Sequence, residues 1–345
     1  MSAVVVVGAG IVGASVAYHL TRRGVPVTLL EQGPAPATGV TADSFAWVSG
    51  ARGEWPGGAL DLREYVLADH RRLEAELPQV TVRHTGSLTW GGEPAETSRP
   101  GPGQFRVGRS DITALEPRLR HPPEQAIHVP GDIGVDATAL TRALVAAAAA
   151  HGATVLYDTA VTGLQMSGER VGGVLTSTGP HPAATVVLTA GTSVPALCEP
   201  LPVELPITAS PACLARITAP PGLVRTIVAR PDFEVREARD GELLMVPRVA
   251  DQAAPLDQAV QEALRRMRAA FRGSEQCRLL GYRAARRPMP AHGPLIGYAT
   301  RARSAYVAVM HSAIGLAPTV GRLVADELAT GELTPELRRC RPRVT

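Results

Sequence analysis

Three glycines close to the N-terminus have the spacing of a phosphate-binding turn. Gly8, Gly10 and Gly13 follow the β-branched run Ala3–Val7, which is typical of a strand covered on both faces. The pattern predicts that Gly8 permits the tight turn, that Gly10 lets the backbone approach a pyrophosphate, and that Gly13 allows close helix packing. The helix expected over 14–23 then offers free N–H groups to the phosphates.

An acidic residue at the end of the second expected strand completes this pattern. Glu31 follows the apolar run Val25–Leu30, about 20 residues after the turn, where a carboxylate accepts hydrogen bonds from a ribose. Its charge argues against NADP, because it would repel a 2′-phosphate. We therefore expect a dinucleotide to contact the turn and the strand end, at Gly8, Ala9, Gly10, Ile11, Val12, Gly13, Glu31 and Gln32.

The segment after Glu31 helps to distinguish between the two common dinucleotides. An NAD domain usually continues with regular strand–helix units. Here Pro34–Gly39 and the hydroxyl-rich stretch Thr41–Trp47 come next. The sequence therefore favours FAD, and an NAD-linked dehydrogenase stays open as the alternative.

Two later segments, 185–197 and 305–328, each combine an apolar strand, a small-residue turn and a helix. With the glycine turn and the loop at 41–47, they resemble the D-amino-acid oxidase, glycine oxidase and sarcosine oxidase family of flavoproteins, over nearly the full length. The resemblance implies that the loop lies near the flavin, that residue 161 contacts adenine, and that the last turn faces the flavin pyrimidine. The implied FAD contacts are Thr41, Ser44, Phe45, Ala46, Val161, Ala190, Gly191, Ser312, Ala313, Gly315, Leu316 and Ala317.

The same resemblance implies an arginine that binds the substrate carboxylate. Family members have an Arg-Pro-x-x-x-Asp-Gly-type stretch in the region of 281–297, which makes Arg287 the first choice and Arg286 the second. A planar guanidinium binds a carboxylate through two parallel hydrogen bonds. The sequence departs from the family where His292 stands in place of the aspartate. The other residues expected at the substrate site are His311, Trp47 and Tyr282.

The implied reaction is oxidation of the C–N bond of a small amino acid or secondary amine. Hydride transfer to flavin N5 gives an imine, which water hydrolyses. Sarcosine-oxidase-like relatives use a lysine to assist reaction with oxygen, and this chain has no lysine. The electron acceptor is therefore O2 assisted by another cation, or a different acceptor. No cysteine stands where some relatives attach FAD, so we expect noncovalent FAD. A flavin-binding protein with a degraded site, suggested by the altered 291–293 stretch, is a further alternative.

The composition excludes several other classes. All 35 basic residues are arginine, which excludes a lysine Schiff base and a P-loop lysine. The net charge of +3 is spread along the chain with few aromatic residues, so nucleic acid is not expected as a partner. The four cysteines are scattered, so we expect no metal site. No run of about 20 apolar residues and no secretory signal is evident, so we expect no membrane span and a cytoplasmic location.

The order of the strands and helices expected to position these residues predicts an α/β protein of two domains. A Rossmann-like FAD-binding domain with a parallel sheet is expected to be discontinuous, from 1–80, 134–204 and 286–345. An antiparallel sheet with a helix is expected from 81–133 and 205–285, as the substrate domain. The periodicity predicts helices at 62–77, 111–119, 136–151 and 258–271, a hairpin at 161–176 and a polar loop before Val129. The Pro- and Gly-rich stretch at 94–108 is the one candidate for disorder.

Overall fold

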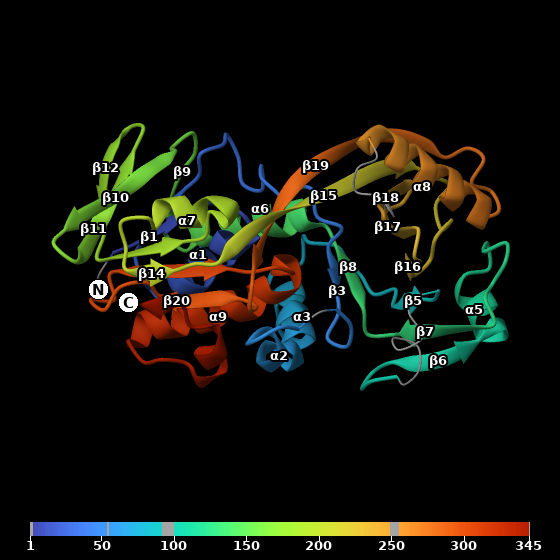
Figure 1. Ribbon diagram of the computed structural model, residues 1–345, viewed down its shortest axis with the longest axis horizontal. Coiled ribbons are helices and arrows are strands. Elements are labelled where there is room, and N and C mark those ends of the chain that lie inside the picture. Colours follow the sequence, from blue (N-terminus) through green and yellow to red (C-terminus); the bar gives the residue numbers. More distant parts are fainter. Residues whose placement is uncertain (1–2, 54, 92–99, 249–254, 345) are drawn as a thin grey trace.

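The computed structural model describes residues 3–53, 55–91, 100–248 and 255–344. Two large sheets organise the chain into two lobes (Figure 1). One sheet carries the N-terminal glycine turn, and the other is built from the middle of the chain. This arrangement confirms the predicted α/β fold with a Rossmann-like part and a second sheet. The exact domain boundaries stay a prediction.

The first sheet has six strands in the order β20-β21-β13-β1-β2-β9. All neighbours pair in parallel except β20, which runs antiparallel to β21. The buried β-branched runs of the sequence supply its centre, because a strand covered on both faces needs no polar side. The strands are β1 (Val4–Val7), β2 (Val27–Leu30), β9 (Thr154–Leu156), β13 (Thr185–Leu188), β20 (Leu295–Tyr298) and β21 (Ala305–Val309).

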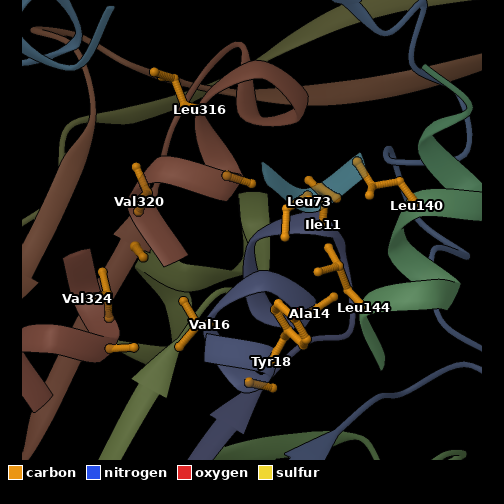
Figure 2. Close-up of a cluster of buried hydrophobic side chains, with 14 of the residues drawn as sticks. Ile11, Ala14, Val16, Tyr18, Leu73, Leu140, Leu144, Leu316, Val320 and Val324 are labelled. Atoms are coloured by element: carbon orange, nitrogen blue, oxygen red, sulfur yellow. The ribbon is translucent and has the colours of Figure 1, made fainter. Parts of the chain in front are cut away.

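Helices on one face of this sheet pack against one another and against its strands to form the main hydrophobic core (Figure 2). Within that core α1 and α9 are in close contact: the Ser15 hydroxyl donates to the Ala317 carbonyl at 2.7 Å, and a Cβ at Gly321 would lie 2.2 Å from Ser15 Oγ. The Asp136 side chain caps α6 by accepting from the Ala139 N–H. The helices are α1 (Ile11–Arg22), α3 (Val66–Glu76), α6 (Ala137–Ala150) and α9 (Ala313–Thr330).

The second sheet has eight strands in the order β19-β15-β18-β17-β16-β5-β7-β6. All its neighbours are antiparallel except the pair β16 and β5, and a second core lies against α8 and α5. The strands are β5 (Ser87–Thr89), β6 (Phe105–Gly108), β7 (Gln125–Val129), β15 (Ile207–Thr218), β16 (Ile227–Ala229), β17 (Phe233–Arg239), β18 (Glu242–Pro247) and β19 (Arg278–Pro290). The two helices are α5 (Arg109–Leu115) and α8 (Leu256–Ala270).

The paired strands β15 and β19 connect the two lobes. Their register runs from Ile207 opposite Pro290 to Thr218 opposite Arg278, and the ribbon extends from one lobe into the other (Figure 1). A small sheet in the order β3-β8-β4 lies at the same junction. Its strands are β3 (Trp47–Val48), β4 (Val82–Arg83) and β8 (Ile133–Val135).

The remaining elements are short or peripheral. A three-stranded sheet contains the predicted hairpin and one further strand. Its members are β10 (Val161–Ser167), β11 (Arg170–Thr176) and β12 (Gly179–Pro182). The others are α2 (Ala59–Leu62), η1 (Arg63–Tyr65), η2 (Gly191–Ser193), α7 (Val194–Leu197), β14 (Val203–Glu204), η3 (Pro335–Cys340) and β22 (Arg343–Val344). Within the described ranges, none of the helices combines the length and apolarity needed to cross a bilayer.

Three local predictions were wrong. The expected polar loop before Val129 contains β7, and residues 105–108 of the stretch suggested for disorder form β6. Both strands were missed because pairing stabilises them: β6 pairs with β7, and β7 also pairs with β5. Such pairing between distant segments cannot be inferred from the local sequence. Residues 94–99 of that stretch lie outside the described ranges. The helix expected over 62–77 is divided into α2, η1 and α3.

Candidate functional site

A large cavity opens where the two lobes meet. It has a volume of about 1860 Å³ and is lined by the β1–α1 turn, residues between 38 and 55, the start of α9 and the β15–β19 ribbon. Pockets for drug-sized ligands measure about 300–1,000 Å³. This cavity therefore has room for a dinucleotide and a second small molecule.

The glycine turn forms one end of the cavity with the geometry that the sequence predicts. Gly8 has a φ of +98°, in the region that favours glycine. A Cβ at Gly13 would lie 2.0 Å from the Gly8 carbonyl oxygen, so only glycine lets α1 start this close to β1. Gly10 caps α1 with extended backbone and no side-chain bond. The first-turn N–H groups of α1 are therefore directed to the site, where they suit phosphate oxygens.

Glu31 lies at the end of β2 and lines the same end of the cavity. Its side chain is nearly buried, and its two carboxylate oxygens accept hydrogen bonds from the N–H groups of Ala9 at 2.7 Å and Gly33 at 2.9 Å. These bonds fix the orientation of the carboxylate. Each oxygen keeps further acceptor capacity, which matches the hydroxyl donors of a ribose.

The segment 41–48, here called the cofactor loop, runs along the cavity wall. Its first residue, Thr41, accepts a hydrogen bond from the Ile11 N–H at 3.2 Å, which ties the loop to the start of α1. Ala46 has a φ of +52°, a strained conformation for a residue with a side chain. The Trp47 indole donates to Asp132 Oδ2 at 2.7 Å, and burial raises the pKa of that carboxyl. The loop is thus held at both ends.

The start of α9 closes the cavity on a third side. Pro318 inside the helix has no N–H, so the carbonyl of Ile314 has no helical donor. His70 Nε2 lies 3.1 Å from that carbonyl oxygen and 3.2 Å from the Gly315 oxygen, and supplies the missing donor when it is neutral with the proton on Nε2. Burial lowers the pKa of His70 to about 4, which keeps the ring neutral. Ser312, with a φ of +56°, is the N-cap residue that precedes the helix.

Arginines dominate the charge of the opposite wall. Arg286 and Arg287 on β19 both line the cavity, and no carboxylate among the described residues forms an ion pair with either. Arg287 Nη2 makes only long contacts, at 3.4 Å to Ser210 Oγ and 3.5 Å to the Pro211 oxygen, and its Nε is buried with no partner in the described part of the chain. A buried donor without an acceptor is costly, so this guanidinium is suited to an anionic ligand.

The cavity brings together most of the residues that the sequence singled out. Those that line it are Gly8, Gly10, Ile11, Val12, Glu31, Gln32, Thr41, Ser44, Phe45, Ala46, Trp47, Val161, Ala190, Gly191, Arg286, Arg287, His311, Ser312, Ala313, Gly315 and Leu316. Ala9, Gly13 and Ala317 lie directly behind the wall, where they hold the turn and the helix pair. Tyr282 is not brought to the cavity, because it packs against the core of the eight-stranded sheet instead.

Several lining residues were missed by reasoning from the sequence. Trp55 and Thr89 line the cavity with buried polar atoms that have no partner among the described residues. Thr189 follows β13 and donates to the Val7 oxygen at 2.7 Å and the Gly8 oxygen at 3.1 Å, supporting the turn. Arg283 pairs with Asp43 of the cofactor loop at 3.3 Å. No spacing in the sequence relates these positions, since they meet only through the fold.

The chemistry of the donor set fits a flavin dinucleotide rather than a metal. Across the described ranges, no group of three His, Cys, Asp or Glu side chains is placed to hold a metal ion. The glycine turn and the Glu31 carboxylate suit a pyrophosphate and a ribose at one end. The cavity is also lined by the cofactor loop and the start of α9, and its volume exceeds that of a drug-sized pocket.

Comparisons with known proteins agree with this assignment. The family model described as "DAO: FAD dependent oxidoreductase" matches residues 3–327. The chain is 29% identical over 228 residues to "Uncharacterized oxidoreductase YurR" of Bacillus subtilis, covering 60% of each chain. It is 28% identical over 283 residues to "Glycine oxidase" of Pseudomonas aeruginosa, covering 76% of each. The chain thus spans less than two thirds of the first of these relatives.

Solved structures show the same fold. The glycine oxidase from Geobacillus kaustophilus aligns with a TM-score of 0.86 at 21% identity, covering 100% of this chain and 99% of that one. Because the family model covers most of the chain, the NAD-linked alternative is set aside. The chain belongs to the DAO family of FAD-dependent oxidoreductases.

Proposed function

We propose that this protein oxidises the C–N bond of a small amino acid or secondary amine that carries a carboxylate. The relatives named glycine oxidase and D-amino acid dehydrogenase support the reaction class. The observation that carries the proposal is the Arg287 guanidinium, which lines the cavity with its Nε buried and without an acceptor in the described chain.

The protein's own contribution to this reaction is binding and orientation. FAD, when bound noncovalently, supplies the acceptor for the hydride that leaves the substrate carbon. The Arg287 guanidinium would bind the substrate carboxylate in a bidentate manner. Trp47, Trp55 and Trp90 line the cavity and offer apolar surfaces that exclude water. As the C–H hydride leaves, the amine gives its N–H proton to solvent water, and hydrolysis of the imine releases the carbonyl product together with ammonia or the remaining amine.

A direct test is anaerobic bleaching of the bound flavin by a panel of D-, L- and N-methyl amino acids and matched amines without a carboxylate. We expect at least one carboxylate-bearing amine to reduce the flavin and its decarboxylated analogue to do so far more slowly. If no member of the panel bleaches the flavin, the degraded-site alternative replaces this proposal.

The Arg287→Ala variant tests the residue assignment. A hydrogen bond to a charged group contributes about 1.5–3 kcal/mol, so the concentration for half-maximal reduction is expected to rise roughly 10- to 100-fold. Arg286→Ala is the matched control. The Arg286 side chain is exposed, and among the described residues it donates only to the Ala209 oxygen, at 3.3 Å, so a smaller effect is expected. A larger effect in Arg286→Ala would move the assignment by one residue.

The electron acceptor is decided by a separate measurement. Because the chain has no lysine, an oxidase would need another cation to assist the reaction with oxygen. Mixing the reduced protein with air-saturated buffer and with a quinone, and comparing the two rates of reoxidation, identifies the acceptor class.

A further inference from the structure

The most deeply buried arginine near the site is one that does not line the cavity. Arg236, on β17 of the eight-stranded sheet, is only 2% exposed. Its Nε donates to the Phe45 oxygen at 2.7 Å, its Nη2 to the Val135 oxygen at 2.8 Å, and its Nη1 to the Glu237 oxygen at 3.4 Å. One side chain thereby joins the second lobe, the cofactor loop and β8.

The surroundings are arranged to admit this side chain. A Cβ at Gly134 would lie 2.8 Å from Arg236 Nη1, so glycine at that position makes room for the guanidinium. The guanidinium carbon lies 5.5 Å from the centroid of the Phe45 ring, which itself lines the cavity. Arg236 therefore contacts the cofactor loop from the side opposite the cavity.

The contact falls next to the strained residue of the loop. Phe45 immediately precedes Ala46, whose φ is +52°. The Ala46 carbonyl in turn accepts from the Val135 N–H at 3.2 Å, and Val135 is the second residue that Arg236 binds. A strained conformation persists only where the surroundings determine it. Arg236 thus binds the Phe45 carbonyl directly, and it also binds the carbonyl of Val135, the residue whose N–H donates to the Ala46 carbonyl.

The charge of Arg236 is not neutralised by a direct partner. Within the described ranges all its hydrogen bonds go to backbone carbonyls. The neighbouring carboxylate of Glu237 pairs with Arg83 at 3.0 Å. Burial lowers the pKa of Arg236 to about 10, which leaves the group charged at neutral pH. A buried charge is weakly screened by salt.

We propose that Arg236 is a positioning residue that holds the cofactor loop in the conformation that binds FAD, and that its buried charge favours the reduced, negatively charged flavin. The proposal depends on FAD binding by this family and not on the substrate proposed above. Preorganised positive charge stabilises negative charge that develops in a site with little water.

The test measures FAD affinity and reduction potential rather than turnover. In Arg236→Met we expect the dissociation constant for FAD to rise at least roughly tenfold, because the Phe45 and Val135 carbonyls lose their donor. The ratio of affinities for reduced and oxidised flavin should also fall roughly tenfold, which lowers the two-electron potential by about 30 mV. In Arg236→Lys the potential should stay close to that of the unmodified protein, while FAD binding weakens, since one ammonium cannot replace the planar fork.

Two further variants keep the test decisive. Arg239→Met removes an exposed arginine from the same strand and should change neither quantity. Gly134→Ala keeps Arg236 and its charge but crowds the guanidinium, so FAD binding should weaken with little change in potential. If Arg236→Met does not fold, Gly134→Ala decides the positioning role, and the potential of Arg236→Gln, which removes the charge but keeps an amide donor, decides the electrostatic role. Unchanged FAD affinity in Gly134→Ala or in a folded Arg236→Met overturns the positioning role. An unchanged potential in Arg236→Met overturns the electrostatic role.

Discussion

At the scale of single residues, the glycine turn leaves no space for a side chain at position 13. A Cβ at Gly13 would overlap the Gly8 oxygen at 2.0 Å and crowd Thr189 Oγ1 at 2.5 Å. Neither Gly8 nor Thr189 can move away, because Gly8 follows β1, Thr189 follows β13, and these two strands are paired and hydrogen-bonded at this point. Moving α1 away from the strand would also displace the N–H groups that face the cavity.

Gly13→Ala is therefore expected to lower the free energy of unfolding by about 1–3 kcal/mol or more and to abolish retention of FAD. Chemical denaturation and the flavin absorbance of the purified protein measure the two effects. Gly163→Ala is the matched control, since its added Cβ meets nothing within 4 Å. A Gly13→Ala protein that keeps its flavin would show that the turn can relax.

At the scale of elements, α9 depends on a residue from another helix. Its inner proline leaves a carbonyl of the first turn without a partner, and His70 of α3 supplies the donor. The same turn carries Ala313 and Gly315 on the cavity wall. The anchoring of α9 is thus linked to the charge state of a buried histidine.

This link predicts a pH dependence of stability. The unfolded chain protonates His70 below its ordinary pKa of 6.5, whereas the folded chain does so only near pH 4. The unfolded state therefore binds more protons between these values, so the stabilisation is fully present above pH 6.5 and is lost as the pH falls towards 4. The decrease in the free energy of unfolding between pH 7 and pH 5 should therefore be about 2 kcal/mol smaller in His70→Gln than in the unmodified protein.

His19, also buried and with its pKa lowered to about 3, remains in both proteins. The difference between their two pH profiles therefore isolates His70. Parallel profiles from urea titrations would contradict the assignment of a neutral, buried ring at this position.

At the scale of the whole molecule, the cavity belongs to both lobes. Its walls come from the six-stranded sheet on one side and the β15–β19 ribbon on the other, and the ion pair of Arg283 with Asp43 joins the two sides. A bound dinucleotide would therefore add contacts across the junction of the lobes seen in Figure 1.

Removal of FAD should accordingly destabilise the protein as a unit. A ligand that binds only the folded state stabilises it by about 2.7 kcal/mol when its free concentration is 100 times its dissociation constant. The apoprotein should unfold earlier by this amount in denaturant, and added FAD should restore the loss. ADP at the same free concentration as FAD is the control for the nucleotide half alone. An apoprotein as stable as the loaded protein would argue against a site of this extent.

The sequence by itself determined the cofactor end of the site. The glycine turn and the Glu31 carboxylate are local features, because neighbouring residues within one strand–turn–helix–strand unit define their geometry. The buried parallel strands were equally predictable from their continuous apolar runs. Strand β20, the edge strand β6 and the division of the 62–77 helix were not, since pairing and packing with distant segments decide them.

Only the tertiary structure decided the substrate side. It separated Tyr282 from the cavity, gave Arg287 a buried nitrogen without an acceptor in the described chain, and placed Arg236 behind the cofactor loop. The sequence offers many arginines of the same type, and their spacing does not distinguish them. The arginines differ in the backbone carbonyls and carboxylates that the fold brings within hydrogen-bonding distance of each guanidinium. These contacts join residues that lie far apart along the chain, so the sequence alone does not reveal them.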